Sequence, residues 1–428
     1  MERKKTLPLA SHRAGTLLFW MCWLVYFAAQ LGRMNYSVAL TGIVDTGFLP
    51  KSTAGLIGTC FYFCYGSGQL LSGWLGDRVN CYLLLLIGLA GSALTNLWMS
   101  FADGLAPMMI AWGINGIVQS LLWTPLLKLF ATALPSEQRT KACVNIATTT
   151  PLGALACYLL SNWALSRFGW HQVFFVSALP MLVCSLVFAA GAYILSKQPT
   201  ARPAQAPAAA VSAAGQPAPS ASYRLGPLLV MSGVLFMMLP IAVQSVLKDG
   251  MTTWTPTMLT ETFAVDPSFA VTLTMILPIP NLIGGYLGTW VNEKFFRNEL
   301  KTASVFFAFS FACLAVMYFT AKLSIWCVVT ALALVVMAMH AVNIMIITFV
   351  PVRFSKYGHT GMVSGVLNAT AYLGGAVSTY GIGWFAEKIG WGGTMLLWVG
   401  LCGLVTAMCA LIIPRWARFL DKTSALPD

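Results

Sequence analysis

Charged residues are scarce in this chain. Of its 428 residues only 9% are Asp, Glu, Lys or Arg, whereas 58% are hydrophobic. Soluble domains carry about 25% charged residues, so this sequence has too few charges to cover a water-facing surface. The composition excludes an ordinary soluble enzyme and predicts a protein with many membrane-spanning segments.

Acidic residues are the scarcest charges, with 13 Asp and Glu against 25 Lys and Arg. Only Asp249 is expected to lie deep inside an apolar segment. Exporters of organic cations and most proton-coupled sugar carriers need a buried carboxylate as counter-ion or proton carrier. The sequence therefore predicts an electropositive cavity and an anionic ligand, and it argues against a cation or multidrug exporter.

Catalytic and metal-binding motifs are also missing. The chain contains no HExxH, GxSxG or P-loop pattern, and its 11 Cys and four His form no CxxC and no His–Cys cluster. We therefore expect no enzymatic activity, no metal, no cofactor and no disulfide framework. His340 lies in an apolar run and could carry a proton, but a single His in such a run is more often a structural residue.

Long apolar runs dominate what is present. A membrane-spanning helix needs about 20 apolar residues, and runs of this kind recur along the whole sequence. The twelve predicted spans are 15–45, 53–77, 82–101, 105–133, 140–166, 171–196, 225–261, 267–293, 302–320, 323–351, 360–387 and 391–414.

Basic residues gather in every second loop. The loops on the side opposite the N-terminus hold only Lys51, Arg167, Lys322 and Lys388 of the 25 Lys and Arg. Because cytoplasmic loops collect Lys and Arg, both termini are predicted to be cytoplasmic. We expect a multi-pass protein of the plasma (inner) membrane whose net charge of +12 reflects topology and contact with membrane lipid, not nucleic-acid binding.

A Pro- and Ala-rich stretch, PTARPAQAPAAAVSAAGQPAPSAS, separates the sixth and seventh spans. It has no apolar period and predicts a disordered cytoplasmic linker. The expected organisation is a tail (1–14), a six-helix bundle (15–196), the linker (197–224), a second six-helix bundle (225–414) and a C-terminal tail (415–428).

The two halves resemble each other. GWLGDR at 73–78 follows the second span and TWVNEK at 289–294 follows the eighth, and the cations Arg33 and Lys248 precede these segments at nearly equal distances. Two six-helix repeats joined by a long loop are typical of the major facilitator architecture. The predicted fold class is therefore an all-α membrane protein with twelve transmembrane helices in two pseudo-symmetric six-helix bundles.

Several segments resemble one transporter family in particular. They are LGRMNYSVAL at 31–40, YGSGQLLSGWLGDR at 65–78, LLWTPLLK at 121–128, LKDGMTTWTP at 247–256 and NATAYLGGAVS at 368–378. Together they are similar to the organophosphate:phosphate antiporters, such as glycerol-3-phosphate and hexose-6-phosphate transporters. The resemblance covers nearly the whole chain. It implies a monomer that exchanges a small phosphorylated solute for inorganic phosphate or another anion by alternating access.

Three basic residues lie inside predicted spans. A cation at the bilayer centre costs about 2.5–3.5 kcal/mol on insertion scales, so Arg33 and Lys248 are expected to have a function. The resemblance assigns these two to gripping phosphate and Lys128 to the family's basic position on helix four. Asp249 follows Lys248, but neighbouring helical residues point about 100° apart, which disfavours a direct pair.

Other candidate solute-binding residues are polar or aromatic. The resemblance places the family's tyrosines on Tyr26, Tyr65 and Tyr372. The sequence departs from the family where Gln30 replaces a Tyr, Gln69 a Lys and Thr148 a His, which makes the site less positive. These three residues and Asn145 are candidate partners for solute hydroxyls.

Charges at span ends suggest a gate. Asp77 and Arg78 follow the second span, and Glu293 and Lys294 follow the eighth. Loop charges of this kind can pair in one transport state and separate in another.

Two alternatives remain open from the sequence. The reduced positive charge also suits a monoanionic sugar acid or another carboxylate. The family resemblance extends to a membrane sensor of phosphorylated sugars, which the sequence does not separate from a carrier.

Overall fold

The computed structural model describes residues 11–134, 136–198, 225–321, 323–354, 357 and 359–424. The predicted linker lies outside these ranges except for its first two residues. Most of the predicted N-terminal tail and the last four residues also lie outside them. Within these ranges the chain forms helices and turns and no strand.

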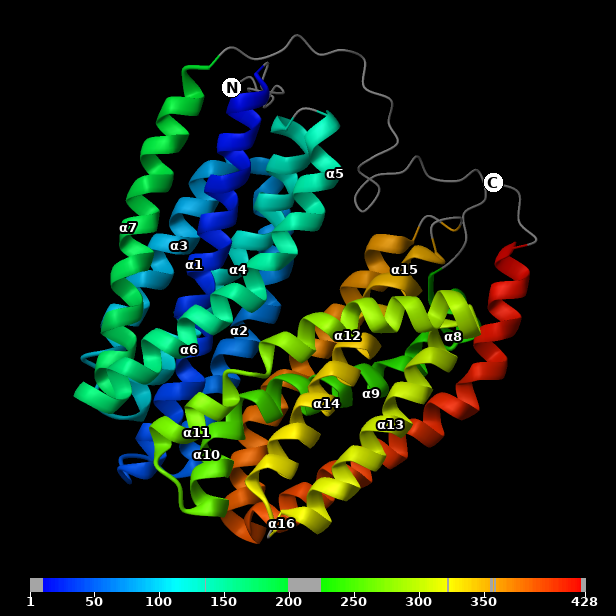
Figure 1. Cartoon of the computed structure of the whole chain (residues 1–428). Helices are drawn as coiled ribbons and strands as arrows, with labels where there is room; N and C mark the ends of the chain where they lie inside the picture. Colours follow the sequence, from blue (N-terminus) through cyan, green and yellow to red (C-terminus); the bar gives the residue numbers. More distant parts are fainter. Residues whose placement is uncertain are drawn as a thin grey trace. The chain divides into compact units, whose positions relative to one another are not determined.

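The described part of the first half is helical, with short turns between its helices (Figure 1). Its helices are α1 His12–Asp45, α2 Lys51–Arg78, α3 Cys81–Met99, α4 Leu105–Ala133, α5 Ser136–Asn145, the 3-10 turn η1 Ile146–Thr148, α6 Thr149–Phe168 and α7 Trp170–Ser196. The fifth span is thus built from α5, η1 and α6 in sequence.

The second half is more interrupted. Its elements are α8 Leu225–Ser232, α9 Val234–Ser245, the π-helical turn η2 Val246–Gly250, α10 Met251–Phe263, α11 Pro267–Thr274, α12 Pro278–Val291, the π-helical turn η3 Asn292–Phe296, α13 Glu299–Thr320, α14 Ile325–Asn343, the π-helical turn η4 Ile344–Phe349, α15 Val350–Val352 and α16 Thr360–Ser424.

The described part of the chain contains ten helical stretches long and apolar enough to cross a membrane. The longest, in α16, is two spans, because Gly390 (φ 69°, ψ 177°) interrupts the helix. The remaining span is α2, which Gly, Ser and Thr make less apolar than the others. The predicted fold of twelve membrane helices is therefore confirmed. The last helix continues past the expected end at 414, as far as Ser424.

The chain forms two compact units. Unit 1 comprises residues up to Gly42 and residues from Cys60 through α7, and unit 2 comprises residues 43–59 and the second half of the chain. The short hairpin of residues 43–59, where α1 ends and α2 begins, therefore packs with helices from the other half of the sequence.

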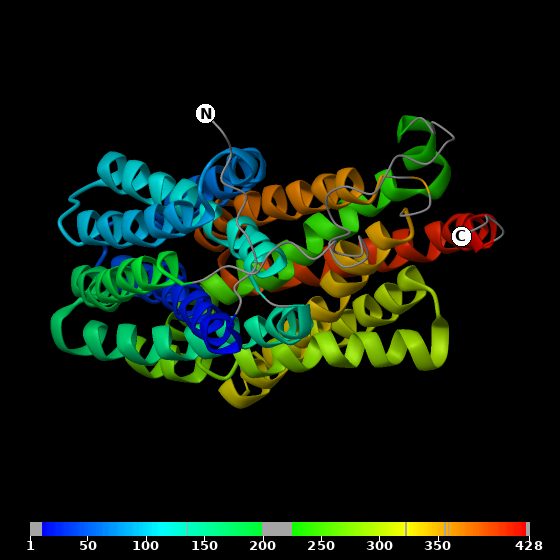
Figure 2. The same cartoon turned by 90° about the horizontal axis from the view of Figure 1, so that it is seen from above.

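Small residues allow the helices of each unit to approach closely. In unit 1, α3 lies against α4 and α7 (Figure 2). A Cβ on Gly88 of α3 would lie 2.9 Å from the Val118 carbonyl oxygen of α4. In unit 2, α16 lies against α9 and α13, and a Cβ on Gly374 would meet the backbone of Ala242. Close contacts of small residues are the usual basis of helix packing in membranes, where lipid is as apolar as the side chains.

A buried carboxylate ties three elements of unit 2 together. Glu299, in the first turn of α13, is 0% exposed. It accepts a bond of 2.7 Å from Nε of Arg353 and one of 3.0 Å from Nε1 of Trp416 in α16. An Nη of Arg353 also lies 2.6 Å from the same carboxylate. An anion in the first turn also interacts favourably with the helix dipole.

Replacing Glu299 with Gln should destabilise unit 2. The variant keeps the side-chain volume but removes the charge that pairs with Arg353, at a cost of about 2 kcal/mol. We expect a lower melting temperature for the purified protein in detergent. Glu293→Gln, at an exposed acidic residue nearby, is the control and should melt like wild type. Equal melting temperatures for all three proteins would contradict a stabilising role.

Candidate functional site

Arg33 lies against an aromatic wall in unit 1. Its guanidinium carbon is 4.7 Å from the ring centre of Tyr65 and 5.8 Å from that of Phe61, both on α2. Both rings are 3% exposed, whereas Arg33 is only partly buried. A cation over an aromatic face is stabilised by about 0.5–2 kcal/mol. This contact holds the planar group in place, with part of its surface still exposed. Two predicted site residues, Arg33 and Tyr65, are therefore in contact.

A buried amide network fixes the backbone of α1 around Arg33. Asn115 and Asn96 donate to the Gly32 carbonyl at 2.8 and 3.3 Å, and Gln119 donates to the Ala29 carbonyl at 3.2 Å. A carbonyl oxygen has two lone pairs, so these bonds can add to the helical ones. The network orients the turn that carries Arg33. Sequence reasoning missed it, although three amides in apolar spans α3 and α4 were a visible signal.

The glycine at position 32 is required by this arrangement. A Cβ there would lie 2.6 Å from the Met181 side chain of α7 and 2.7 Å from the Asn96 amide. Any larger residue would push α1 away from α3 and α7. The LGR sequence therefore combines a close helix contact with the adjacent cation.

Two other predicted site residues on α1 lie within unit 1. The Tyr26 ring centre is 4.9 Å from that of Trp123 on α4. Gln30 is 3% exposed, and its Oε1 atom has no hydrogen-bond partner within the described ranges. Gln69 is half-buried on α2. An unsatisfied buried amide oxygen costs about 1–3 kcal/mol, so the Gln30 side chain would be stabilised by a hydrogen-bond donor.

Thr148 bridges two spans of unit 1. Its hydroxyl accepts a bond of 3.0 Å from Nε1 of Trp23 on α1 and donates one of 2.8 Å to the Asn145 carbonyl. The bond to Asn145 lies within the 3-10 turn η1, a conformation that often marks a hinge or a strained sequence. Both predicted residues are exposed, Asn145 at the end of α5 and Thr148 in the turn.

Lys128 of α4 contacts the C-terminal end of a neighbouring helix, α2. Its Nζ donates a bond of 2.6 Å to the Gly76 carbonyl, near the C-terminus of α2. Cations commonly bind the last carbonyls of a helix, where the dipole is negative. The structure thus gives Lys128 a role in joining α4 to α2, next to the Asp77–Arg78 segment.

Lys248 forms an ion pair with its neighbour in unit 2. Its Nζ lies 3.0 Å from Oδ1 of Asp249, and the two side chains are 19% and 30% exposed. Regular helical spacing disfavours a direct pair between neighbours, but the structure shows one here. These residues lie in the π-helical turn η2, not in a regular α-helix, and the long Lys side chain can curl back to its neighbour. In this structure the positive charge of Lys248 is therefore balanced by the carboxylate of Asp249.

Close contact with α16 accompanies the π-helical turn. A Cβ on Gly250 would lie 2.7 Å from Oγ of Ser378 and from Ile382, so only glycine fits. The hydroxyls of Thr252 and Thr253 donate to the carbonyls of Lys248 and Asp249 at 2.6 and 2.8 Å. Single π turns occur frequently at functional sites. These bonds fix the backbone that carries the ion pair.

His340 on α14 lies near the same ion pair. The helix that carries it packs against η2, where the pair lies, and the Nδ1 atom of His340 has no hydrogen-bond partner among the described residues. Tyr372 is half-buried on α16. Unit 2 thus has a cluster of Lys248, Asp249 and His340, of which only Lys248 was a predicted site residue.

The four predicted gate residues lie at the ends of α2 and α12. Arg78 is exposed at the end of α2, where Asp77 precedes it, and Glu293 is exposed in η3. The Nζ of Lys294 lies 5.0 Å from the ring centre of Trp290, which is a cation–π contact within its own segment.

A charged cluster that sequence reasoning missed holds the 43–59 hairpin in unit 2. Nζ of Lys51 lies 2.6 Å from Oε2 of Glu261 at the end of α10, and Nε1 of Trp391 donates to the same oxygen at 2.8 Å. Glu387 accepts a bond of 3.1 Å from the Ser52 backbone N–H, in the first turn of α2. From the sequence, Lys51 is identified only as a basic residue in a loop.

Further along α2, hydroxyl groups continue this contact. Thr59 donates to the Ala376 carbonyl at 2.6 Å, and its hydroxyl lies 2.9 Å from that of Thr379 on α16. Trp254 on α10 is fully buried and donates to the Thr379 carbonyl at 3.0 Å. The W-T-P segment of the family resemblance therefore joins α10 to α16, beside the hairpin.

The sequence model of the Major Facilitator Superfamily matches residues 22–379. The chain belongs to the major facilitator superfamily. Its fold agrees: a bacterial homologue of the human lysosomal transporter Spinster superposes with a TM-score of 0.70 at 15% identity, covering 97% of this chain and 98% of that one.

Three relatives show what this major facilitator protein is similar to. A probable hexose phosphate transport protein of Chlamydia pneumoniae is 26% identical over 168 residues, 39% of this chain and 36% of that protein. The membrane sensor protein UhpC of Salmonella typhimurium is 24% identical over 300 residues, 67% of this chain and 66% of that protein. A D-galactonate transporter of Escherichia coli is 23% identical over 168 residues, 39% of each chain.

These relatives confirm the resemblance to the organophosphate:phosphate antiporter family. The chain spans just over a third of the length of the hexose phosphate relative. It is a multi-pass membrane protein of a transporter superfamily and not an enzyme.

In this major facilitator protein, Asp249 should compete with an anionic ligand for Lys248. Replacing Asp249 with Asn removes a partly exposed ion pair worth about 1 kcal/mol, so inorganic phosphate should bind about fivefold more tightly. Isothermal titration of the purified protein measures this. Asp103→Asn, at an exposed carboxylate 3.6 Å from Nε2 of His171, is the control and should bind like wild type. Weaker binding by Asp249→Asn would show that the carboxylate supports the ligand.

Proposed function

We propose that this protein carries a small organic anion across the plasma membrane by alternating access, and that the solute is a phosphorylated metabolite. The observation that supports this is that each unit keeps a basic side chain within a membrane span: Arg33 on α1, together with Lys128 on α4, in unit 1, and Lys248 in η2 of unit 2. Keeping cations there is costly, and an anionic solute recovers part of that cost.

Arg33 and Lys248 have different chemistry. The guanidinium of Arg33 presents a planar fork that can donate to two oxygens of a phosphate or carboxylate at once. Its contact with Tyr65 already restricts the Arg33 side chain. Less conformational entropy is therefore lost when a solute binds. Lys248 supplies a mobile point charge. The remaining predicted site residues, with Gln30 foremost, would donate to or accept from the solute hydroxyls.

The same charges favour exchange over one-way transport. Closing an empty, positively charged site removes its charge from water, which has a desolvation cost. A bound anion lowers that cost. Inorganic phosphate or another anion would then return as the first solute leaves, while the two halves rock around the bound solute.

A monoanionic sugar acid is the second candidate solute. The Lys248–Asp249 pair removes one positive charge from unit 2, so Arg33, Lys248 and Asp249 together carry a net charge of about +1, which matches a carboxylate. The similarity to a D-galactonate transporter supports the same alternative. A sensor role is the third candidate, supported by the similarity to UhpC.

We propose that both termini are cytoplasmic, because basic residues concentrate in the loops on the N-terminal side. The 43–59 hairpin, with Lys51 and Glu261, then lies at the outer side, where it would have to leave α10 and α16 for the site to open outward. The Asp77–Arg78 and Glu293–Lys294 segments would act as the gate at the cytoplasmic side.

Counterflow in proteoliposomes tests the proposed transport. We expect glucose 6-phosphate to enter vesicles loaded with inorganic phosphate at least about tenfold faster than empty vesicles, because the empty site returns slowly. Arg33→Lys should lose this uptake, since the charge remains but the fork is lost. Arg167→Lys, at an exposed residue in the last turn of α6, is the control and should transport like wild type.

The other outcomes separate the candidates. Equal rates into loaded and empty vesicles would rule out obligatory exchange. Uptake of galactonate without uptake of any phosphate ester would select the sugar-acid carrier. Binding of a sugar phosphate with no flux in any direction would select the sensor.

A disulfide across the hairpin tests whether it moves. In Thr59→Cys/Thr379→Cys the new thiols replace hydroxyls 2.9 Å apart. Oxidation should abolish uptake and a thiol reductant should restore it, because the cross-link holds α2 against α16. Each single Cys variant, carrying the same native cysteines, should be insensitive to the oxidant. Full activity of the cross-linked protein would show that the hairpin does not need to move.

A further inference from the structure

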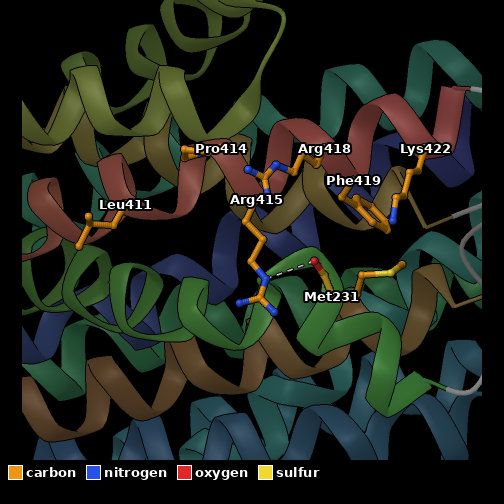
Figure 3. A pocket seen from close by; sticks show the side chains of 7 residues that line it. All are labelled: Met231, Leu411, Pro414, Arg415, Arg418, Phe419 and Lys422. Atoms are coloured by element: carbon orange, nitrogen blue, oxygen red, sulfur yellow. Dashed lines mark hydrogen bonds between the residues drawn. The ribbon is translucent and has the colours of Figure 1, made fainter.

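The end of α16 carries a basic face that the proposed transport mechanism does not use. Arg415, Arg418 and Lys422 are spaced by three and four residues, which places them on one side of the helix. All three side chains are exposed. Together with Met231 of α8 they line a cavity of about 480 Å³ (Figure 3).

These cations have no carboxylate partner within the described part of the chain. Arg415 donates from Nε to the Met231 carbonyl at 3.3 Å, and its guanidinium lies 5.5 Å from the ring centre of Phe236. Arg418 and Lys422 have no ion pair or hydrogen bond to any described residue. The nearby Asp421 is not among the residues that line the cavity. Among the described residues that line it, the cavity therefore carries three positive charges and no negative one.

Apolar side chains border the same cavity. Leu411, one turn before Arg415, is 80% exposed, and Met231 is 41% exposed. On α9, beside Arg415, Phe236 is 48% exposed. One helical turn rises about 5.4 Å, so the apolar and basic side chains lie at successive depths along α16. That order, apolar then cationic, matches the order of acyl chain and headgroup in a phospholipid.

The topology of the chain explains only part of this pattern. Basic residues tend to gather at the cytoplasmic side, and this explains why the charged residues around the cavity are positive. It does not require three of them on one helix face, around a cavity with an apolar border. Basic pockets between membrane helices on the cytoplasmic side are the usual binding sites for anionic lipid headgroups.

We propose that this cavity binds an anionic phospholipid of the cytoplasmic leaflet. Arg418 and Lys422 contact the headgroup phosphate. Arg415, which donates to the Met231 carbonyl of α8, contacts the same phosphate. Leu411 and Phe236 contact the acyl chains. The bound lipid bridges α16 and α8, and thereby stabilises the start of the second half of the chain. Gly233 (φ 83°), which separates α8 from α9, lies at this bridge, since a Cβ there would be 3.4 Å from Cδ of Arg415.

Native mass spectrometry of the detergent-purified full chain measures lipid binding directly. We expect phosphatidylglycerol to bind at least about tenfold more tightly than phosphatidylcholine. Each cation contributes about a fivefold increase in affinity near an anionic membrane surface. Arg415→Gln/Arg418→Gln/Lys422→Gln should therefore abolish the preference for phosphatidylglycerol. Arg418→Gln alone should weaken it about fivefold, so the test remains valid if the triple variant folds poorly.

A matched control removes three other exposed cations, Lys197, Arg297 and Lys301, from the same predicted side. This variant should bind phosphatidylglycerol like wild type. An equal loss in the control would show a general charge effect and overturn the proposal. Equal binding of the two lipids by wild type would also overturn it, and so would complete displacement of the lipid by millimolar inorganic phosphate, because the cavity would then be a site for a free anion.

Discussion

Charges inside a bilayer must be offset close by, and this constraint accounts for the arrangement of both units. A cation at mid-membrane costs several kcal/mol if water does not reach it. Here Arg33 lies over the ring of Tyr65 and Lys248 pairs with Asp249. At the start of α13, the buried Glu299 is satisfied by Arg353 and Trp416. The helices around each charge are therefore held by short contacts.

The positions of the membrane spans could be predicted from sequence because the bilayer sets their length. The interruptions could not. The 3-10 turn before Thr148 and the π turn around Lys248 depend on contacts with other helices, such as the bond from Trp23 to Thr148 and the approach of Ser378 to Gly250. Hydrophobic periodicity contains no record of such contacts, so the interruptions leave no signal in it.

The candidate site shows the same division between what composition reveals and what packing decides. Arg33 and Lys248 stand out in sequence because charges are rare in apolar runs. The ion pair with Asp249 is disfavoured by regular helical geometry, which separates neighbours by about 100°, and it forms here in a π turn that the sequence does not reveal. The contact between Lys51 and Glu261 joins residues 210 positions apart. A single sequence offers no means of finding a pair at that distance.

The Lys248–Asp249 pair has a consequence for any anion carrier built on this chain. The carboxylate already occupies the place on Lys248 that a solute phosphate or carboxylate would take. Binding then exchanges one anion for another, and the electrostatic gain is the difference between two similar interactions. A small difference gives modest affinity, which suits a protein that must release its solute on each cycle. On the proposed mechanism, the planar fork of Arg33 selects the anion, and the competition at Lys248 limits how tightly it is held.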